Sequence, residues 1–215
     1  MTELQNPYLN EFMALQIEYT RAMGYGANGH FLINFRPTDA DLNIVMNYFR
    51  TREALRHQYA YAIFTQTELE LIKSHAPRLV SIGAGTGYVE CLLSQIACEV
   101  IAFDETPYKN HWCDGNYFPI SAGSANSIKD YPNHALFLCW PPYDDPMAYD
   151  ALTTYQGNVI VYVGEGEGMA TADDQFHEAL ESQWDLLVDE KQQHNWDGLH
   201  SRIFIYKRKE NSNGS

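Results

Sequence analysis

Residues 78–104 constrain the fold of this chain more than any other part of the sequence. The segment opens with a short apolar run, residues 79–82, which is typical of a buried parallel strand. Three glycines follow at alternate positions, Gly83, Gly85 and Gly87. Because glycine has no Cβ atom, the backbone can turn sharply there and bring its N–H groups close to a ligand. The sequence therefore predicts a ligand-binding turn directly after a buried strand.

The residues after the glycines complete a strand–helix–strand pattern. Residues 86–97 have the apolar periodicity of a helix, and residues 100–103 form a second apolar run that ends at Asp104. A carboxylate at the tip of a second parallel strand is well placed to accept hydrogen bonds from the two hydroxyls of a ribose. We therefore predict a strand–helix–strand unit that holds an adenine nucleoside.

The glycine spacing separates two classes of cofactor. Dinucleotide sites use G-x-G-x-x-G, but Tyr88 stands at the sixth position here and would crowd a pyrophosphate. The pattern instead resembles the first motif of the S-adenosylmethionine (SAM) dependent methyltransferases of the seven-stranded Rossmann-like class. A nicotinamide cofactor and a purely structural turn remain as alternatives. The resemblance implies that SAM is contacted by Gly83, Ala84, Gly85, Thr86, Gly87, Asp104 and Glu105.

The rest of the chain supplies enough elements for that fold. Further strands are expected at residues 118–122, 135–139, 158–163, 184–188 and 199–206, with helices over residues 3–24, from residue 39 after a Thr38 cap, 145–155 and 172–180. The resemblance implies an α/β fold: a doubly wound, mostly parallel seven-stranded sheet with helical crossovers, an antiparallel C-terminal strand and an N-terminal helical extension. We expect an extension or lid at residues 1–75, a SAM-binding domain at 76–209 and a disordered tail at 210–215.

Two further segments resemble cofactor contacts of the same class. Tyr61 lies in an aromatic stretch that leads to Thr65, a candidate helix cap. Methyltransferases place a similar segment over the methionine end of SAM, although Gln66 stands where proline is usual. A helix start with core aromatic residues explains the stretch equally well. At the end of the third expected strand, Ser124 and Ala125 are candidates to contact the adenine.

The fourth expected strand ends in Trp140-Pro141-Pro142-Tyr143. Amino-group methyltransferases carry Asp or Asn, two prolines and an aromatic residue at the similar position, so these four residues are the catalytic candidates. The prolines stiffen the backbone beside the methyl group, their missing N–H groups leave carbonyls for a substrate amine, and Tyr143 is expected to stack on a planar substrate. Trp140 replaces the oxygen-bearing residue, which puts amine transfer and adenine as a substrate in doubt. A proline-stiffened turn is the alternative.

The loop after the fifth expected strand is acidic. Glu165 lies at the carboxyl edge of the sheet and is a candidate substrate contact or base. For Asp173 and Asp174 we favour a local role, since acidic side chains stabilise the N-terminus of the helix that follows. Thr171 is another candidate helix cap.

Composition restricts the partners. The net charge is −14, with 14 Lys and Arg against 28 Asp and Glu, whereas duplex nucleic-acid binding draws most of its affinity from basic side chains. We therefore expect a small-molecule or planar substrate rather than a nucleic acid. The histidines lack H-E-x-x-H spacing and the four cysteines lack C-x-x-C pairing, so no metal is expected. The polar start of the chain and the absence of a long apolar run predict a cytoplasmic protein without a membrane segment.

Together these patterns predict a SAM-dependent methyltransferase that acts on a small or planar acceptor, with transfer to nitrogen as one option. Three alternatives stay open: a nicotinamide oxidoreductase, a nucleobase N-methyltransferase of the adenine type acting on RNA or DNA, and a non-catalytic protein that binds SAM or only a partner. The sequence leaves the oligomeric state undetermined.

Overall fold

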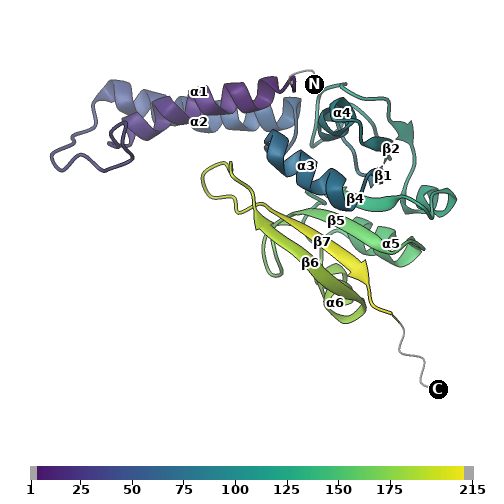
Figure 1. Ribbon diagram of the computed structural model, residues 1–215. Helices are drawn as coiled ribbons and strands as arrows, with labels where there is room; N and C mark the ends of the chain where they lie inside the picture. The colour runs from purple at the N-terminus through teal and green to yellow at the C-terminus, as the bar shows by residue number, and fades with distance from the viewer. Residues whose placement is uncertain (1–3, 211–215) are drawn as a thin grey trace.

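The computed structural model describes residues 4–210, and the part of the expected tail beyond residue 210 lies outside them. Figure 1 shows a twisted sheet with helices on both sides and a helical pair that projects from one end. No helix among residues 4–210 is both long and apolar enough to cross a membrane. The elements are α1 (Pro7–Ala22), α2 (Asp39–Gln58), α3 (Gln66–His75), β1 (Arg78–Ile82), α4 (Tyr88–Gln95), β2 (Glu99–Asp104), β3 (Ser121–Ala122), the 3₁₀ helix η1 (Ala125–Asp130), β4 (Ala135–Cys139), α5 (Met147–Thr154), β5 (Val159–Gly164), α6 (Asp174–Gln183), β6 (Trp184–Lys191) and β7 (Arg202–Arg208).

The strands form a seven-stranded sheet in the order β3-β2-β1-β4-β5-β7-β6. The pairs among β1 to β5 are parallel, whereas β7 lies antiparallel between β5 and β6. This arrangement confirms the expected fold class. From β1 the chain first adds β2 and β3 on one side of the sheet and then β4 and β5 on the other. The strand order therefore reverses between β1 and β4, and ligands of open parallel sheets bind at the carboxyl ends of the strands at such a switch point.

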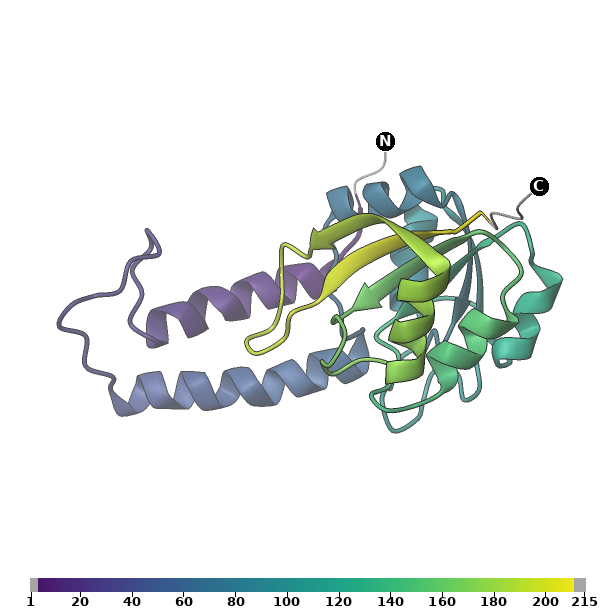
Figure 2. The ribbon, with the colours of Figure 1, turned by 90° about the horizontal axis from the view of Figure 1, so that it is seen from below.

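Both faces of the central strands β1, β4 and β5 are buried, as the apolar composition of these strands predicts. In β4, Phe137 packs on one face, while Leu136 and Leu138 pack on the other. Helices α3 and α4 contribute side chains to the first face, and α5, α6 and η1 contribute to the second. Figure 2 shows α5 and α6 together on one side of the strands. Successive side chains along a strand therefore belong to two separate hydrophobic layers, one on each face of the sheet.

The connection between the second and third strands differs from the helical connections elsewhere in the parallel part of the sheet. All residues between β2 and β3 are described, and residues 105–120 form an irregular loop without a helix. The third strand is correspondingly short, Ser121–Ala122 instead of residues 118–122. The loop bonds to other segments instead, since the Tyr117 N–H donates to the Thr86 carbonyl at 3.0 Å. These long-range bonds replace the local bonds of a helix or strand.

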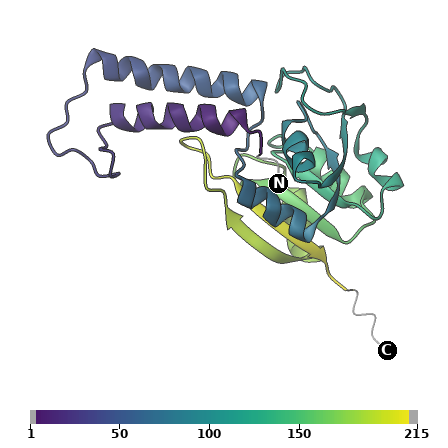
Figure 3. The same cartoon turned by 45° about the horizontal axis from the view of Figure 1, so that its top comes forward.

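Helices α1 and α2 pair along their lengths and extend away from the sheet (Figure 3). Helix α1 begins at Pro7, later than expected, because Asn6 caps it by accepting the Leu9 N–H. Two of the three predicted threonine caps are confirmed: Thr38 and Thr65 each form a capping box with the acidic residue three positions on. The projecting pair remains attached to the sheet through a shared core.

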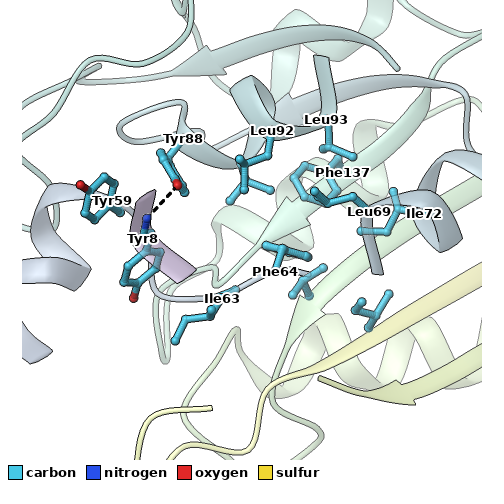
Figure 4. Close-up of a cluster of buried hydrophobic side chains, with 14 of the residues drawn as sticks. Tyr8, Tyr59, Ile63, Phe64, Leu69, Ile72, Tyr88, Leu92, Leu93 and Phe137 are labelled. Atoms are coloured by element: carbon cyan, nitrogen blue, oxygen red, sulfur yellow. Dashed lines mark hydrogen bonds between the residues drawn. The ribbon is translucent and has the colours of Figure 1, made fainter. Parts of the chain in front are cut away.

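That core joins the N-terminal helices to the strands. Tyr8 and Tyr59 stack at a centroid distance of 5.0 Å, and the Tyr88 hydroxyl accepts the Tyr8 N–H at 3.2 Å (Figure 4). The same hydroxyl donates to Asn6 Oδ1 at 2.9 Å. One continuous cluster runs from these rings to Phe137 in the sheet. The large residue after the glycine turn therefore fastens α1 to α4.

Candidate functional site

A cavity of about 1000 Å³ opens at the carboxyl edge of β1, β2 and β4. Its walls come from the glycine turn, the tips of β2 and β4, and the end of α2. Of the residues singled out from the sequence, it is lined by Tyr61, Gly83, Ala84, Gly85, Thr86, Asp104, Glu105, Ser124, Ala125, Trp140, Pro141, Pro142 and Tyr143. Gly87 and Glu165 are not among the described lining residues. The fold thus brings both informative motifs to one space.

The glycine turn has a left-handed backbone. The φ angles of Gly83, Gly85 and Gly87 are +73°, +57° and +73°, a region that residues with a Cβ atom rarely adopt. A Cβ atom on Gly87 would lie 2.8 Å from the Phe118 Cβ. Gly87 therefore allows close packing and caps α4, while Gly83 and Gly85 face the cavity.

Asp104 is fixed at the tip of β2. Its side chain is nearly buried, and its two oxygens accept N–H groups from Gly85 and Thr106, each at 2.8 Å. Each carboxylate oxygen keeps a second lone-pair site, because a carboxylate has about four in total. Asp104 is therefore held in one orientation at the cavity wall and can accept further hydrogen bonds from hydroxyl groups.

The loop at residues 105–120 covers the glycine turn. Tyr108 N donates to the Gly85 carbonyl at 2.9 Å, which adds to the bond from Tyr117 to Thr86. On the other side, the Thr86 hydroxyl donates to the Tyr59 carbonyl. The turn is thus held between the end of α2 and this loop. This leaves the Thr86 side chain occupied by a structural bond although it borders the cavity.

Three aromatic side chains, Tyr61, Trp112 and Trp140, form an aromatic wall of the same cavity. The Tyr61 ring centroid is 5.5 Å from that of Trp140 and 6.5 Å from that of Trp112. Trp140 has a φ of +53°, which is uncommon for a bulky residue. Its indole N–H donates to Ser201 Oγ at 3.0 Å, so its polar atom is engaged away from the aromatic wall. Trp140 contributes a flat apolar surface and no side-chain oxygen.

One carbonyl of the Pro-Pro turn is less available than the sequence suggests. The Pro141 carbonyl accepts the Ala172 N–H at 3.2 Å, which ties the turn to the start of α6. Pro142 and Tyr143 complete the rim, and Tyr143 is 68% exposed. The segment is therefore rigid at its base and open at its aromatic end.

Glu165 has a structural environment. Its buried carboxylate accepts N–H groups from Ala170 at 3.0 Å and His200 at 2.6 Å, which joins two loops. Asp173 caps α6 by accepting the Phe176 N–H at 2.9 Å, as expected. Thr171 does not cap this helix, because its hydroxyl bonds within the Glu165 loop. These acidic residues organise the rim of the site without entering the cavity.

Glu90 on α4 was missed by the sequence reasoning. Its side chain is 2% exposed, lines the cavity and accepts the Ser81 hydroxyl at 2.6 Å. Burial raises the pKa of Glu90 to about 7. A carboxylate three positions before Leu93, on the apolar face of the helix after the glycines, is the signal that could have revealed it.

No family model matches the sequence, and no curated protein matches it either. Among solved structures, a 1,6-didemethyltoxoflavin-N1-methyltransferase from Burkholderia thailandensis, with bound 1,6-didemethyltoxoflavin and S-adenosylhomocysteine, overlaps at a TM-score of 0.51 with 14% identity. The match covers 79% of this chain and 87% of that chain. A magnesium protoporphyrin IX methyltransferase from Synechocystis PCC 6803 with bound SAM gives a TM-score of 0.45 at 10% identity, over 97% of this chain and 100% of that one.

Three findings indicate the same fold: the strand order, the helical layers on both faces of the sheet, and the overlap with the Burkholderia enzyme. The chain has the Rossmann-like fold of that methyltransferase.

Proposed function

We propose that this protein is a SAM-dependent methyltransferase that acts on a small, planar acceptor. One observation carries the proposal: a single cavity joins the glycine turn, the Asp104 carboxylate and the Pro141-Pro142-Tyr143 turn. A nucleoside site and a place for a second molecule thus share one space. The Burkholderia methyltransferase of the same fold holds S-adenosylhomocysteine, which supports the choice of cofactor.

The residues at the cavity fit a cationic nucleoside. Asp104 is oriented to accept the ribose hydroxyls, and the left-handed glycines place backbone rather than side chains beside the ligand. Among the described lining residues, five carry carboxyl groups: Glu90, Asp104, Glu105, Asp145 and Asp150. Bound SAM supplies an activated methyl group on a positively charged sulfur, and a carboxylate-rich wall favours that charge.

The acceptor site is mainly aromatic. Tyr61, Trp112, Trp140 and Tyr143 all border the cavity, and such surfaces stack on flat molecules. Trp140 offers no oxygen to an amine, and the Pro141 carbonyl is already bonded to Ala172. Together with the net charge of −14, these features disfavour an exocyclic nucleobase amine in nucleic acid as the acceptor.

The protein's contribution to the reaction is positioning. The turn from Trp140 to Tyr143 is held by backbone bonds to Val163 and Ala172, so it can fix an acceptor in place. Methyl transfer needs the acceptor atom about 3 Å from the methyl carbon and in line with it. Because the methyl group is already activated on the sulfonium, the transfer needs little acid or base assistance, and a proton lost from the acceptor can pass to solvent.

The proposal is tested by calorimetric titration of SAM, S-adenosylhomocysteine and NAD. We expect binding of both adenosyl compounds, and a 10- to 100-fold loss, of the order expected for a hydrogen bond to a charged group, in Asp104→Asn. Asp130→Asn, which alters an exposed carboxylate at the end of η1, is the matched control and is expected to bind normally. Absence of binding by the wild-type protein at millimolar ligand would refute the proposal.

The alternatives give different results in the same series. Binding of NAD in preference to SAM would indicate an oxidoreductase. Transfer of labelled methyl groups to RNA or DNA, and not to aromatic small molecules, would indicate a nucleobase methyltransferase. Tight SAM binding without transfer to any member of a broad acceptor panel would indicate a non-catalytic binding protein.

A further inference from the structure

The Arg56 side chain carries a positive charge in a cavity whose other charged lining residues are acidic. Among the lining residues within 4–210, it is the only one with a permanently positive side chain, and it stands among five carboxyl groups. It projects from the last turn of α2, outside the glycine and proline motifs. A lone guanidinium in an acidic cavity is suited to select for one negative group on the ligand.

The Arg56 side chain is held in place before any ligand arrives. Its guanidinium carbon lies 4.4 Å from the centroid of the Tyr61 ring, and Nη2 donates to Glu53 Oε2 at 2.7 Å. The side chain is 13% exposed. Stacking fixes the plane of the guanidinium, and the bond to Glu53 fixes its rotation in that plane.

The hydrogen-bonding capacity of Arg56 is only partly used. Its Nε is buried and, among the described residues, has no acceptor within hydrogen-bond distance. A buried donor without a partner is costly, and such groups call for an explanation. A guanidinium carries five N–H donors in a planar fork that matches the two oxygens of a carboxylate, and the bond to Glu53 uses one of them.

The neighbouring segment places this fork beside the proposed cofactor site. Tyr59 and Tyr61 follow Arg56 closely, and the Tyr59 carbonyl accepts the hydroxyl of Thr86 in the glycine turn. Tyr61 also packs against Trp140 on the acceptor side. Arg56 therefore lies where the two halves of the cavity meet.

We infer that Arg56 is the carboxylate-binding residue of this cavity. The inference rests on the proposed function and deepens it. Two carboxylates could occupy the position: that of the amino-acid part of SAM, or one carried by the planar acceptor. Both are recognised by the same fork, and the experiment separates them.

In the first arm, S-adenosylhomocysteine and 5′-methylthioadenosine, which lacks the amino-acid part, are titrated into the full-length protein and two variants. Arg56→Gln removes the charge, and Arg50→Gln makes the same change at an exposed position of the same helix. If the carboxylate belongs to the cofactor, Arg56→Gln weakens S-adenosylhomocysteine 10- to 100-fold and leaves methylthioadenosine unchanged. Arg56→Lys keeps the charge without the fork and should restore only part of the affinity.

In the second arm, stabilisation by benzoate is compared with that by benzamide, with and without S-adenosylhomocysteine. If the carboxylate belongs to the acceptor, wild-type protein prefers benzoate and Arg56→Gln loses that preference, while S-adenosylhomocysteine binding is unaffected. The inference is overturned if Arg56→Gln equals Arg50→Gln in both arms. Should the wild-type protein bind neither nucleoside, the proposed function fails, and the benzoate arm on the protein alone still decides the role of Arg56.

Discussion

At the scale of single residues, Glu90 shows how the fold changes the chemistry of an ordinary side chain. Its carboxyl group is buried between α4 and β1 and has the Ser81 hydroxyl as its hydrogen-bond donor. Burial raises its pKa from 4.5 to about 7, and the nearby Asp104 charge acts in the same direction. The folded protein therefore holds a proton at pH values where the unfolded chain has released it.

This difference predicts a pH-dependent stability. As pH rises from about 4.5 to 7, the Glu90 contribution to the free energy of unfolding falls by about 3 kcal/mol, because charging the buried group costs more than charging the exposed one. Glu90→Gln keeps an acceptor for Ser81 and cannot ionise. We expect the variant to gain about 3 kcal/mol relative to wild type between pH 4 and pH 8 in urea unfolding.

Glu178→Gln, at an exposed site on α6, is the matched control for Glu90→Gln and should show no such pH dependence. A constant difference between Glu90→Gln and wild type across this pH range would show that Glu90 titrates as an ordinary surface glutamate.

At the scale of elements, the two capping boxes have different surroundings. Thr65 and Glu68 exchange bonds at the start of α3, and Glu68 Oε1 also accepts the Gln193 N–H at 2.7 Å. Thr38 and Asp41 form the same box at an exposed position next to the α1–α2 loop. The first box thus joins distant segments, whereas the second acts only within its own helix.

We therefore expect the same substitution to have unequal effects. Thr65→Ala should lower the free energy of unfolding by about 1–2 kcal/mol, the upper range for a lost helix cap, while Thr38→Ala should cost about 0.5 kcal/mol. Chemical denaturation followed by circular dichroism measures both. Thr65→Ser retains the hydroxyl and serves as the control. Equal losses in the two alanine variants would contradict the distinction.

Local patterns predicted the elements that local forces determine. The apolar runs of β1, β2, β4 and β5 and the threonine caps are readable because neighbouring residues produce them. The conformation of the loop at residues 105–120 was not readable, since it depends on hydrogen bonds to the distant Gly85 and Thr86 carbonyls.

The site residues that could be predicted are likewise those set by the local sequence. The glycines, Asp104 and the Pro-Pro turn follow strands and can be placed from the sequence alone. The contributions of Glu90 and Arg56 depend on contacts with Ser81 and Tyr61, which only the folded chain establishes.

At the scale of the whole molecule, the projecting helices and the sheet share their interior. Trp196, in the loop between β6 and β7, is 1% exposed. It contacts the Phe12 and Tyr48 rings and donates its indole N–H to the Tyr8 hydroxyl at 2.8 Å. We propose that the N-terminal extension and the sheet unfold as one cooperative unit, even though the extension protrudes.

Trp196→Ala tests that coupling. We expect a loss of about 3–5 kcal/mol, typical of a large aromatic truncation in a packed core, with a single unfolding transition in both proteins. Ile33→Ala, at a site that is 90% exposed in the α1–α2 loop, should change stability by less than about 0.5 kcal/mol. Two separated transitions in wild-type protein, seen by circular dichroism and tryptophan fluorescence, would show that the extension is independent.

The loop that closes over the glycine turn also has a consequence for biosynthesis. The turn leaves the ribosome before Tyr108 and Tyr117, whose N–H groups satisfy its carbonyls. The nascent chain therefore cannot form these two bonds, which border the cavity, when β1, α4 and β2 are the last parts synthesised. The glycine turn therefore reaches its final hydrogen bonding only after the loop at residues 105–120 has been synthesised, and we expect an isolated fragment of residues 78–104 to lack the ordered turn.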